Sequence, residues 1–185
     1  LHAIDAWTGA ARFSAELARG QRPVGSVLTA GNIVAVVTRD ERGIGLSAFD
    51  RTTGELRWSV APGYAPPLTA WMGVDDAIVG NTEDGEVFAI DAATGETRFR
   101  RTLARSVDDA LPRSLEPVLR SGALFVPQGQ VHVIRPRDGE LLGVVPTDLV
   151  PDLLRVDERC DVFVAEESGH VAAFGAGPQL SLVRK

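Results

Sequence analysis

The sequence has little cysteine and no long hydrophobic run. Cys160 is the single cysteine among 185 residues, which excludes an internal disulfide and a cysteine-based metal cluster, and we expect it to be a small buried residue. The longest uncharged apolar runs, such as 33–37 and 141–145, are about five residues, whereas a membrane-spanning helix needs roughly 20. No membrane span is predicted.

Positive charge is also scarce. The formal net charge is -6, the isoelectric point is near 5.1, and Lys185 is the only lysine. Nucleic-acid binding depends on a basic patch that displaces counterions from the phosphates. We therefore expect no nucleic-acid partner.

A helical pattern is missing as well. No long stretch keeps an apolar period of 3.6 residues, and 19 glycines and 11 prolines interrupt the chain. Hydrophobic residues nevertheless make up 44% of the sequence, enough to build a core without metals or disulfides. These features predict an all-β protein.

The sequence does contain an internal repeat. Four windows share an apolar stretch, an acidic or polar turn and a glycine: 1–13, 46–58, 87–99 and 131–143, with a degenerate fifth copy at 171–175. The fifth position of each window falls at residues 5, 50, 91, 135 and 175, at intervals of 40 to 45 residues. This spacing is typical of propeller blades.

Each window has the chemistry of a β-hairpin. An aspartate can accept bonds from nearby backbone N–H groups, and a glycine can adopt positive φ before the chain returns. Two further strand-like runs precede the windows, for example 24–29 with 32–38. We predict four-stranded antiparallel blades of a β-propeller; a β-sandwich or a solenoid also has short strands, but a sandwich does not require this signature at a blade-length interval.

The repeat resembles that of pyrrolo-quinoline quinone (PQQ)-like, quinoprotein-type β-propellers. The resemblance spans the chain and implies a non-catalytic branch of that bacterial family, in which an aromatic residue docks one blade onto the next. The repeat motif comprises Ala3, Asp5, Thr8, Gly9, Phe13, Ala48, Asp50, Thr53, Gly54, Trp58, Ala89, Asp91, Thr94, Gly95 and Phe99. The fourth copy departs from it at Arg135 and Gly143, and the fifth loses the turn.

The expected organisation is a single propeller segment of about four and a half blades. Residues 1–17 would form an outer hairpin, and complete blades are expected at 23–61, 66–103, 115–146 and 150–184. The resemblance implies a ring of seven or eight blades, so the remaining blades are expected upstream or from an associated chain.

A partner is expected on one end of the blades. The turns within the motif are short and uniform, whereas length variation gathers in the loops at the opposite end, and such loops often carry binding function. The candidates there are Arg39, Arg42, Tyr64, Arg105 and Arg113. The alternative is that these are ordinary solvated loops.

No catalytic constellation is recognisable. His2, His132 and His170 lie in predicted strands without a nucleophile elbow or a metalloprotease helix, and paired acids such as Asp108–Asp109 sit in turns. We predict a protein- or ligand-binding scaffold of the assembly-factor or sensor-domain type, with no catalytic, cofactor or metal site. The alternative is a fragment of a PQQ-dependent quinoprotein dehydrogenase. The resemblance favours a periplasmic or extracytoplasmic location.

Overall fold

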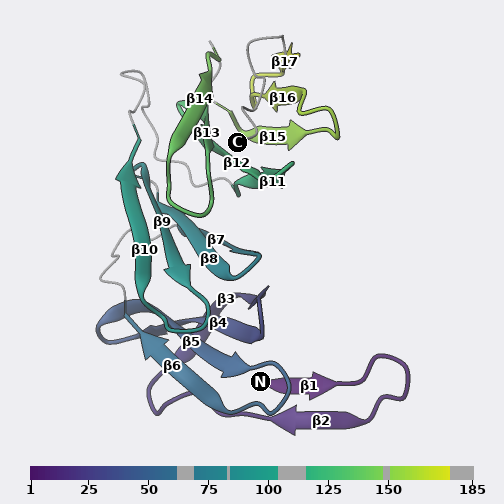
Figure 1. The fold of residues 1–185 in the computed structure, drawn as a ribbon, viewed down its shortest axis with the longest axis vertical. Coiled ribbons are helices and arrows are strands. Elements are labelled where there is room, and N and C mark those ends of the chain that lie inside the picture. The colour runs from purple at the N-terminus through teal and green to yellow at the C-terminus, as the bar shows by residue number, and fades with distance from the viewer. Residues whose placement is uncertain (62–68, 83, 104–115, 148–150, 176–185) are drawn as a thin grey trace. The chain divides into compact units, whose positions relative to one another are not determined.

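The computed structural model describes residues 1–61, 69–82, 84–103, 116–147 and 151–175. All regular secondary structure in these ranges is β, in 17 strands (Figure 1). No helix in these ranges is long and apolar enough to cross a membrane. The all-β prediction and the four-stranded antiparallel sheets predicted for the repeats are confirmed.

The strands form five sheets, and each sheet keeps its strands in sequence order. The first has two strands, β1 (His2–Ile4) and β2 (Ala11–Ser14). The next three sheets have four strands each. The second sheet contains β3 (Arg22–Ala30), β4 (Ile33–Asp40), β5 (Gly43–Asp50) and β6 (Leu56–Val60), and the third contains β7 (Thr69–Val74), β8 (Ala77–Thr82), β9 (Glu86–Asp91) and β10 (Thr97–Thr102). The fourth contains β11 (Val118–Arg120), β12 (Ala123–Gln128), β13 (Gln130–Ile134) and β14 (Leu141–Val145). The last described sheet has β15 (Leu153–Val156), β16 (Val162–Ala165) and β17 (Val171–Phe174). The fourth strand expected within 150–184 lies outside the described residues.

A β-bulge recurs at one repeat position. Between β5 and β6 the register shifts after Ala48, so that Arg57 is the extra residue on the outer strand. The same shift follows Ala3 in the first sheet and Val133 in the β11–β14 sheet. A bulge bends a strand and redirects a side chain, and in these three hairpins it occurs next to the turn of the repeat motif.

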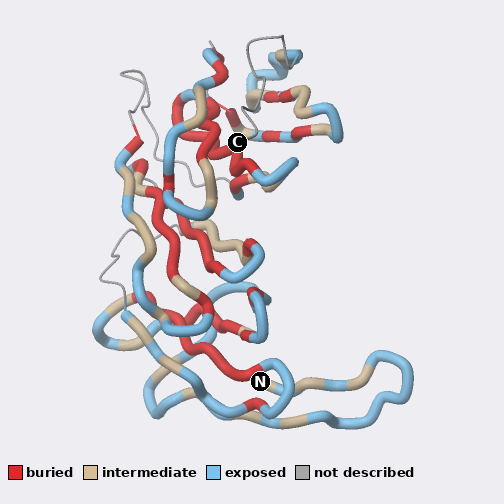
Figure 2. The backbone as a smooth tube through the Cα atoms, viewed as in Figure 1, coloured by how far each residue is buried: buried red, intermediate tan, exposed pale blue. Residues whose placement is uncertain are grey.

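The middle strands of the complete sheets are buried on both faces. Every residue of β8 and β12 is buried, and β5, β9 and β13 are nearly so. The outer strands β6, β10 and β14 are half-exposed (Figure 2). Near-continuous apolar strands are therefore required in the middle of each blade, because neighbouring layers cover both of their faces.

The chain divides into two compact units. The first comprises Leu1–Pro67, Trp71–Val79 and Ile90–Arg98, and the second Leu68–Ala70, Gly80–Ala89 and Phe99–Lys185. In the second unit, buried aliphatic residues of β12, β13, β15 and β16 pack with Phe125 into one cluster. This packing joins the last four-stranded sheet to the sheet that follows it.

Two expectations about single residues are wrong. Cys160 is half-buried rather than buried, and it lies in the turn between β15 and β16 with φ of +65°, where it packs against the edge of the cluster. His170 directly precedes β17 instead of lying within a strand, whereas His2 and His132 lie in β1 and β13.

Candidate functional site

The turn between β5 and β6 shows how the repeat motif forms a hairpin. Asp50 Oδ1 accepts hydrogen bonds from the backbone N–H groups of Thr52 (2.8 Å) and Thr53 (3.0 Å), and its carbonyl accepts one from Gly54 (2.9 Å). The Thr53 hydroxyl accepts a bond from Glu55 N–H at 3.3 Å. The aspartate and threonine side chains thus satisfy the backbone donors of the turn.

The same turn occurs around Asp5 and Asp91. Each carboxylate accepts bonds from the second and third following N–H groups, at 2.9 to 3.1 Å. The turn glycines have almost the same left-handed conformation, with φ of +70° at Gly9, +76° at Gly54 and +77° at Gly95. Glycine is favoured because a Cβ is strained at this φ.

An arginine binds each of these aspartates, and at Arg12 and Arg57 it is the bulged residue. Arg12, Arg57 and Arg98 occupy the window position before the aromatic residue, and they reach Asp5, Asp50 and Asp91 at 2.6, 2.8 and 2.7 Å. The sequence alone predicted no role for these arginines. The arginines recur in the sequence windows, but the bulge at Arg12 and Arg57 arises only when the two strands pair.

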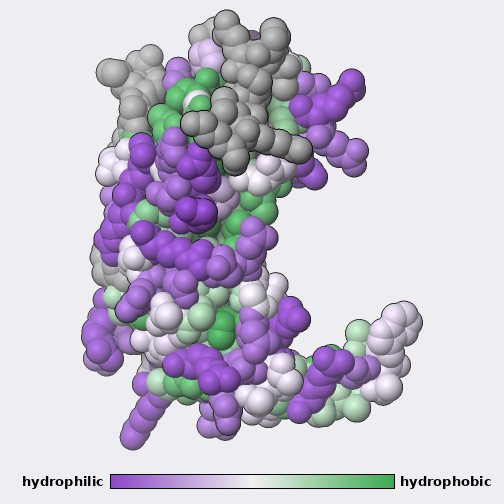
Figure 3. All heavy atoms as spheres, viewed as in Figure 1, coloured by the Kyte–Doolittle hydropathy of each residue, from purple (hydrophilic) through white to green (hydrophobic). Residues whose placement is uncertain are grey.

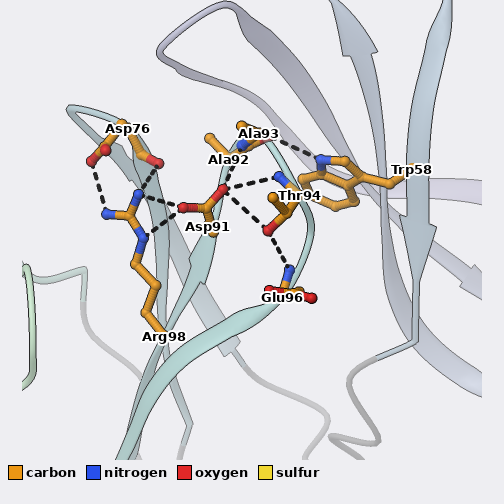
Figure 4. Close-up of polar contacts among 8 residues, drawn as sticks. All are labelled: Trp58, Asp76, Asp91, Ala92, Ala93, Thr94, Glu96 and Arg98. Atoms are coloured by element: carbon orange, nitrogen blue, oxygen red, sulfur yellow. Dashed lines mark hydrogen bonds and ion pairs between the residues drawn. The ribbon is translucent and has the colours of Figure 1, made fainter.

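Arg98 makes the most extensive of these contacts (Figure 4). Its Nε and one terminal nitrogen donate to Asp91 Oδ2, at 3.1 and 2.7 Å. The guanidinium also donates to the side chain of Asp76 at 2.8 Å and to its carbonyl at 3.0 Å. Since Asp76 lies in the β7–β8 turn, Arg98 ties the inner turn of this sheet to its outer hairpin.

These contacts lower the pKa values of the turn carboxylates. The hydrogen bond from Arg57, followed by those from Thr53 and Thr52, lowers the pKa of Asp50 to about 2. Arg12 has the same effect on the pKa of Asp5, and Arg98 on that of Asp91. The carboxylates are therefore ionised in their folded hairpins at neutral pH.

Aromatic rings lie against the turn glycines of the following repeat. A Cβ built on Gly54 would lie 2.4 Å from the ring of Phe13, one on Gly95 2.8 Å from Trp58, and one on Gly139 2.5 Å from Phe99. Such separations are too short for any side chain. Each ring fills the space that the glycine leaves, so the outer strand of one repeat is fastened to the turn of the next.

Trp58 adds a polar contact to this packing. Its indole nitrogen donates to the carbonyl of Ala92 at 2.8 Å, in the turn that contains Gly95 (Figure 4). A phenyl ring cannot make this bond, so Phe13 and Phe99 dock by packing alone.

The fourth hairpin keeps the turn after losing the aspartate. Arg135 replaces it and forms ion pairs with Asp138 (3.1 Å) and Glu140. Glu140 N–H is bound by Asp138 Oδ1 at 3.0 Å, in place of a threonine hydroxyl, and Gly139 keeps a φ of +73°. Leu142, the bulged residue here, packs against the apolar cluster. The turn therefore keeps its glycine and its backbone bonds, while Asp138 and Arg135 supply side-chain contacts different from those of the motif.

Two of the predicted partner-binding arginines, Arg39 and Arg42, lie at the other end of the strands from the motif turns. Arg39 is exposed near the end of β4, and Arg42 lies in the β4–β5 turn with its side chain 85% exposed, 3.9 Å from Asp40. The two residues therefore lie at the same end of the sheet, in and next to the β4–β5 turn. Tyr64, Arg105 and Arg113 lie outside the described residues, and the role of all five stays a prediction.

Other turns at this end are stabilised internally. Thr82 Oγ1 bonds Asp84 and accepts from Glu86 N–H at 3.1 Å, while Gly85 N–H donates to the Thr82 carbonyl at 3.1 Å. Buried His132 lies near the β12–β13 turn, with Nε2 3.3 Å from the Gln128 carbonyl. In the part of the chain that the structure describes, no group of three or more His, Cys, Asp or Glu residues is placed to hold a metal ion.

Repeated antiparallel blades, with an aromatic ring of each of the first three repeats packed on the turn glycine of the next, define a β-propeller with PQQ-like repeats. A family model described as outer membrane protein assembly factor BamB matches residues 1–106, and the chain belongs to this family. The predicted PQQ-like resemblance is thereby confirmed. No curated protein matches the chain.

Solved structures of similar fold include BamB from Moraxella catarrhalis, at 19% identity and a TM-score of 0.65 over 91% of this chain and 51% of that one. The chain therefore spans about half the length of that BamB. The computationally designed Ika4 protein is 18% identical, with a TM-score of 0.60 over 88% of this chain and 97% of that one. The WD40 β-propeller domain of Doa1 is 14% identical, with a TM-score of 0.56 over 80% and 48%. At these identities the likeness concerns the fold.

Proposed function

We propose that the chain is a non-catalytic, protein-binding propeller scaffold that serves in the assembly of outer-membrane proteins, in an extracytoplasmic compartment. The observation that carries this proposal is the match of the BamB assembly-factor family to residues 1–106. A scaffold of this kind needs rigid blades that present variable loops to a partner.

The contacts within the repeats support a rigid end of the blades at the motif turns and a binding end at the opposite loops. The turns that contain Asp50 and Asp91 are bound by their own side chains, by an arginine, and by an aromatic ring of the preceding repeat. At the opposite end, Arg42 projects into solvent. We place the partner surface at that end, with Arg39, Arg42, Tyr64, Arg105 and Arg113 as its contributors.

A matched pair of substitutions tests the placement. Arg42 and Arg51 are both exposed arginines in turns of the β3–β6 sheet, but they lie at opposite ends of its strands. Binding of the chain to purified periplasmic domains of the outer-membrane β-barrel assembly machinery would be measured by biolayer interferometry. We expect combined Arg39→Ala and Arg42→Ala substitution to weaken binding by about tenfold or more, and Arg51→Ala to leave it unchanged.

Equal binding by all variants would refute the placement of the surface, and no binding by the unsubstituted chain would refute the proposed partner class. Fractionation of the protein in its native cells tests the compartment separately.

The dehydrogenase alternative rests on the fold resemblance alone. Addition of PQQ and calcium tests it, because a red-shifted bound chromophore or dye reduction would support an oxidoreductase.

A further inference from the structure

Two arginines lie directly opposite each other at one end of the second sheet. Arg22, the first residue of β3, pairs with Arg39 of β4, and both are exposed. Directly opposite residues of antiparallel strands have Cβ atoms about 5 Å apart, and like charges at this separation destabilise the pairing. In the last described sheet, the pair that begins the inner ladder is apolar, with Leu153 opposite Ala165. The strand pairing itself therefore does not require two arginines.

Among the described residues, neither of these arginines is neutralised by a carboxylate. The arginines of the motif hairpins form ion pairs with aspartates, whereas Arg22 and Arg39 form none. The Asp40 side chain lies on the opposite face of β4 from Arg39, because side chains alternate along a strand, and it accepts a hydrogen bond from Arg42 N–H at 2.8 Å. Residues 61–68, which follow β6 in the sequence, include no aspartate or glutamate.

The lack of a counter-charge distinguishes this pair from the rest of the surface. Hydrophilic side chains cover much of the face drawn in Figure 3, so polar character alone does not mark a site. Arg22 and Arg39 instead hold two positive charges side by side, in a chain whose formal net charge is -6. Such a pair is neutralised only by an anion that the described part of the chain does not supply.

The pair lies on the face of the sheet that is turned toward the following repeat. Side chains alternate between the faces along a strand, and directly opposite residues share a face. Arg39 is therefore on the same face as Ala35. The row that contains Ala35 continues through Ala48 to Trp58, which contacts the β9–β10 turn of the next repeat. The two arginines are thus exposed on the side of a repeat that the chain contains.

We propose that Arg22 and Arg39 form a docking site for an acidic segment of a partner protein, with the exposed Arg42 at its margin. The proposal rests on the proposed function in placing the partner surface at this end of the blades, and it adds Arg22 and the chemistry of the partner. A guanidinium group binds a carboxylate through two parallel N–H bonds. Carboxylates of one extended segment would neutralise both guanidinium groups and remove the repulsion across the β3–β4 ladder.

The charges around the pair favour a protein segment over an anionic membrane or a nucleic acid. Those partners present many phosphates and attract a broad basic surface. Here the adjoining turn contains the exposed Glu41, next to the half-buried Asp40. These acidic residues repel an extended anionic surface, but they leave the two guanidinium groups open to a few carboxylates.

A dye-labelled peptide of about ten residues that alternates glutamate and serine is the probe, and the same peptide with glutamine in place of glutamate is its control. Fluorescence anisotropy would measure binding to the chain at about 20 and 300 mM salt. We expect the acidic peptide to bind about tenfold or more weakly at the higher salt, and the glutamine peptide not to bind. Arg22→Gln and Arg39→Gln should each weaken binding about tenfold or more. Arg51→Gln, an exposed position at the opposite end of the sheet, should leave it unchanged.

Charge reversal gives a second readout that a purely structural role for the arginines would not produce. Arg22→Glu places a carboxylate opposite Arg39, so that an attractive cross-strand pair replaces a repulsive one. We expect this variant to unfold at a higher urea concentration than the unsubstituted chain and yet to lose the acidic peptide. Combined Arg22→Glu and Arg39→Glu substitution restores the repulsion with the opposite sign. This double variant should bind a peptide that alternates arginine and serine.

Two results with the peptide would overturn the proposal. The first is an equal loss of binding in Arg51→Gln and Arg22→Gln, because the net charge of the chain would then be responsible. The second is binding of vesicles that contain anionic phosphatidylglycerol without binding of the peptide, because the arginines would then serve a membrane.

Failure of this proposal is distinguishable from failure of the proposed function. If Arg22→Glu kept full binding to the periplasmic domains of the outer-membrane β-barrel assembly machinery, the arginine site would be overturned and the proposed function would stand. If the chain bound the acidic peptide through Arg22 and Arg39 but did not bind those domains, the site would be supported and the proposed partner class would be refuted.

Discussion

Trp58 and Ala92 are joined by a 2.8 Å hydrogen bond from the indole nitrogen to the carbonyl oxygen, while the indole ring covers Gly95. The contact connects β6 to the turn between β9 and β10, and so fastens one repeat to the next. Its strength should be measurable by substitution, because Phe13 and Phe99 make the related contact without the hydrogen bond.

We expect Trp58→Phe to lower the free energy of unfolding by about 0.5–1.5 kcal/mol, the usual contribution of one hydrogen bond. Trp58→Ala also removes the ring from Gly95 and should cost roughly 3 kcal/mol. Equilibrium urea unfolding measures both values. Equal losses for the two variants would show that the ring packing contributes nothing.

Substitution of glycine in two equivalent turns separates backbone strain from ring packing. Gly9 and Gly54 have φ of +70° and +76°, so alanine should be strained by a similar amount of about 1–2 kcal/mol at each. At Gly54 the added Cβ would also lie 2.4 Å from Phe13, whereas at Gly9 it meets no atom within 4 Å.

We therefore expect Gly54→Ala to be the more destabilising variant, by at least about 1 kcal/mol of overpacking, in the same urea experiment. If Gly9→Ala lowered the free energy of unfolding as much as Gly54→Ala, the ring of Phe13 would not be what excludes a side chain at position 54.

Acidification should weaken the motif turns. The pKa of Asp50 is about 2 in the folded chain, below the ordinary value near 3.9 expected when the chain is unfolded. Its contribution to stability is therefore complete above about pH 4 and is lost as the pH falls toward 2. Asp91 acts in the same direction.

Thermal unfolding between pH 6 and 2 measures this effect. We expect Asp50→Asn to have a shallower fall in melting temperature below pH 4 than the unsubstituted chain. Parallel curves for the two proteins would show that the Asp50 carboxylate is not responsible, and Arg57→Ala should flatten the curve in the same way by removing the main cause of the lowered pKa.

Arg98 should be less replaceable than Arg57. Arg98 binds Asp91, the Asp76 side chain and the Asp76 carbonyl together, which requires the planar guanidinium, whereas Arg57 donates a single bond to Asp50. We expect Arg98→Lys to cost about 1–2 kcal/mol and Arg57→Lys less than about 1 kcal/mol. Urea unfolding of both variants in 1 M salt provides the control, because screening should reduce the contribution of exposed ion pairs at both sites.

Much of the fold was predictable because it repeats. A signature that returns every 40 to 45 residues indicates blades, and alternating turn and strand residues indicate four strands in each. The motif turns followed from local chemistry, since Asp50 and Thr53 bind backbone groups only two or three residues away. Contacts between residues so close in the chain can be predicted from the sequence alone.

The role of Arg57 was not predictable in this way. Its approach to Asp50 depends on a bulge after Ala48, and a bulge arises from the pairing of two strands rather than from the residues of one. Cys160 is a similar case. Its residue type favours burial, but the β15–β16 turn places it at positive φ at the edge of the core.

The sequence by itself determined the class of the protein, the period of its blades and the conformation of its turns, because these depend on contacts between residues close in the chain. Only the tertiary structure decided which apolar strand is covered and which is not. Ile4 and Ile134 occupy the same position in the same hairpin motif, yet one is exposed and the other buried. The difference lies in the strands packed around them, and burial is a property of those neighbours as much as of the residue itself.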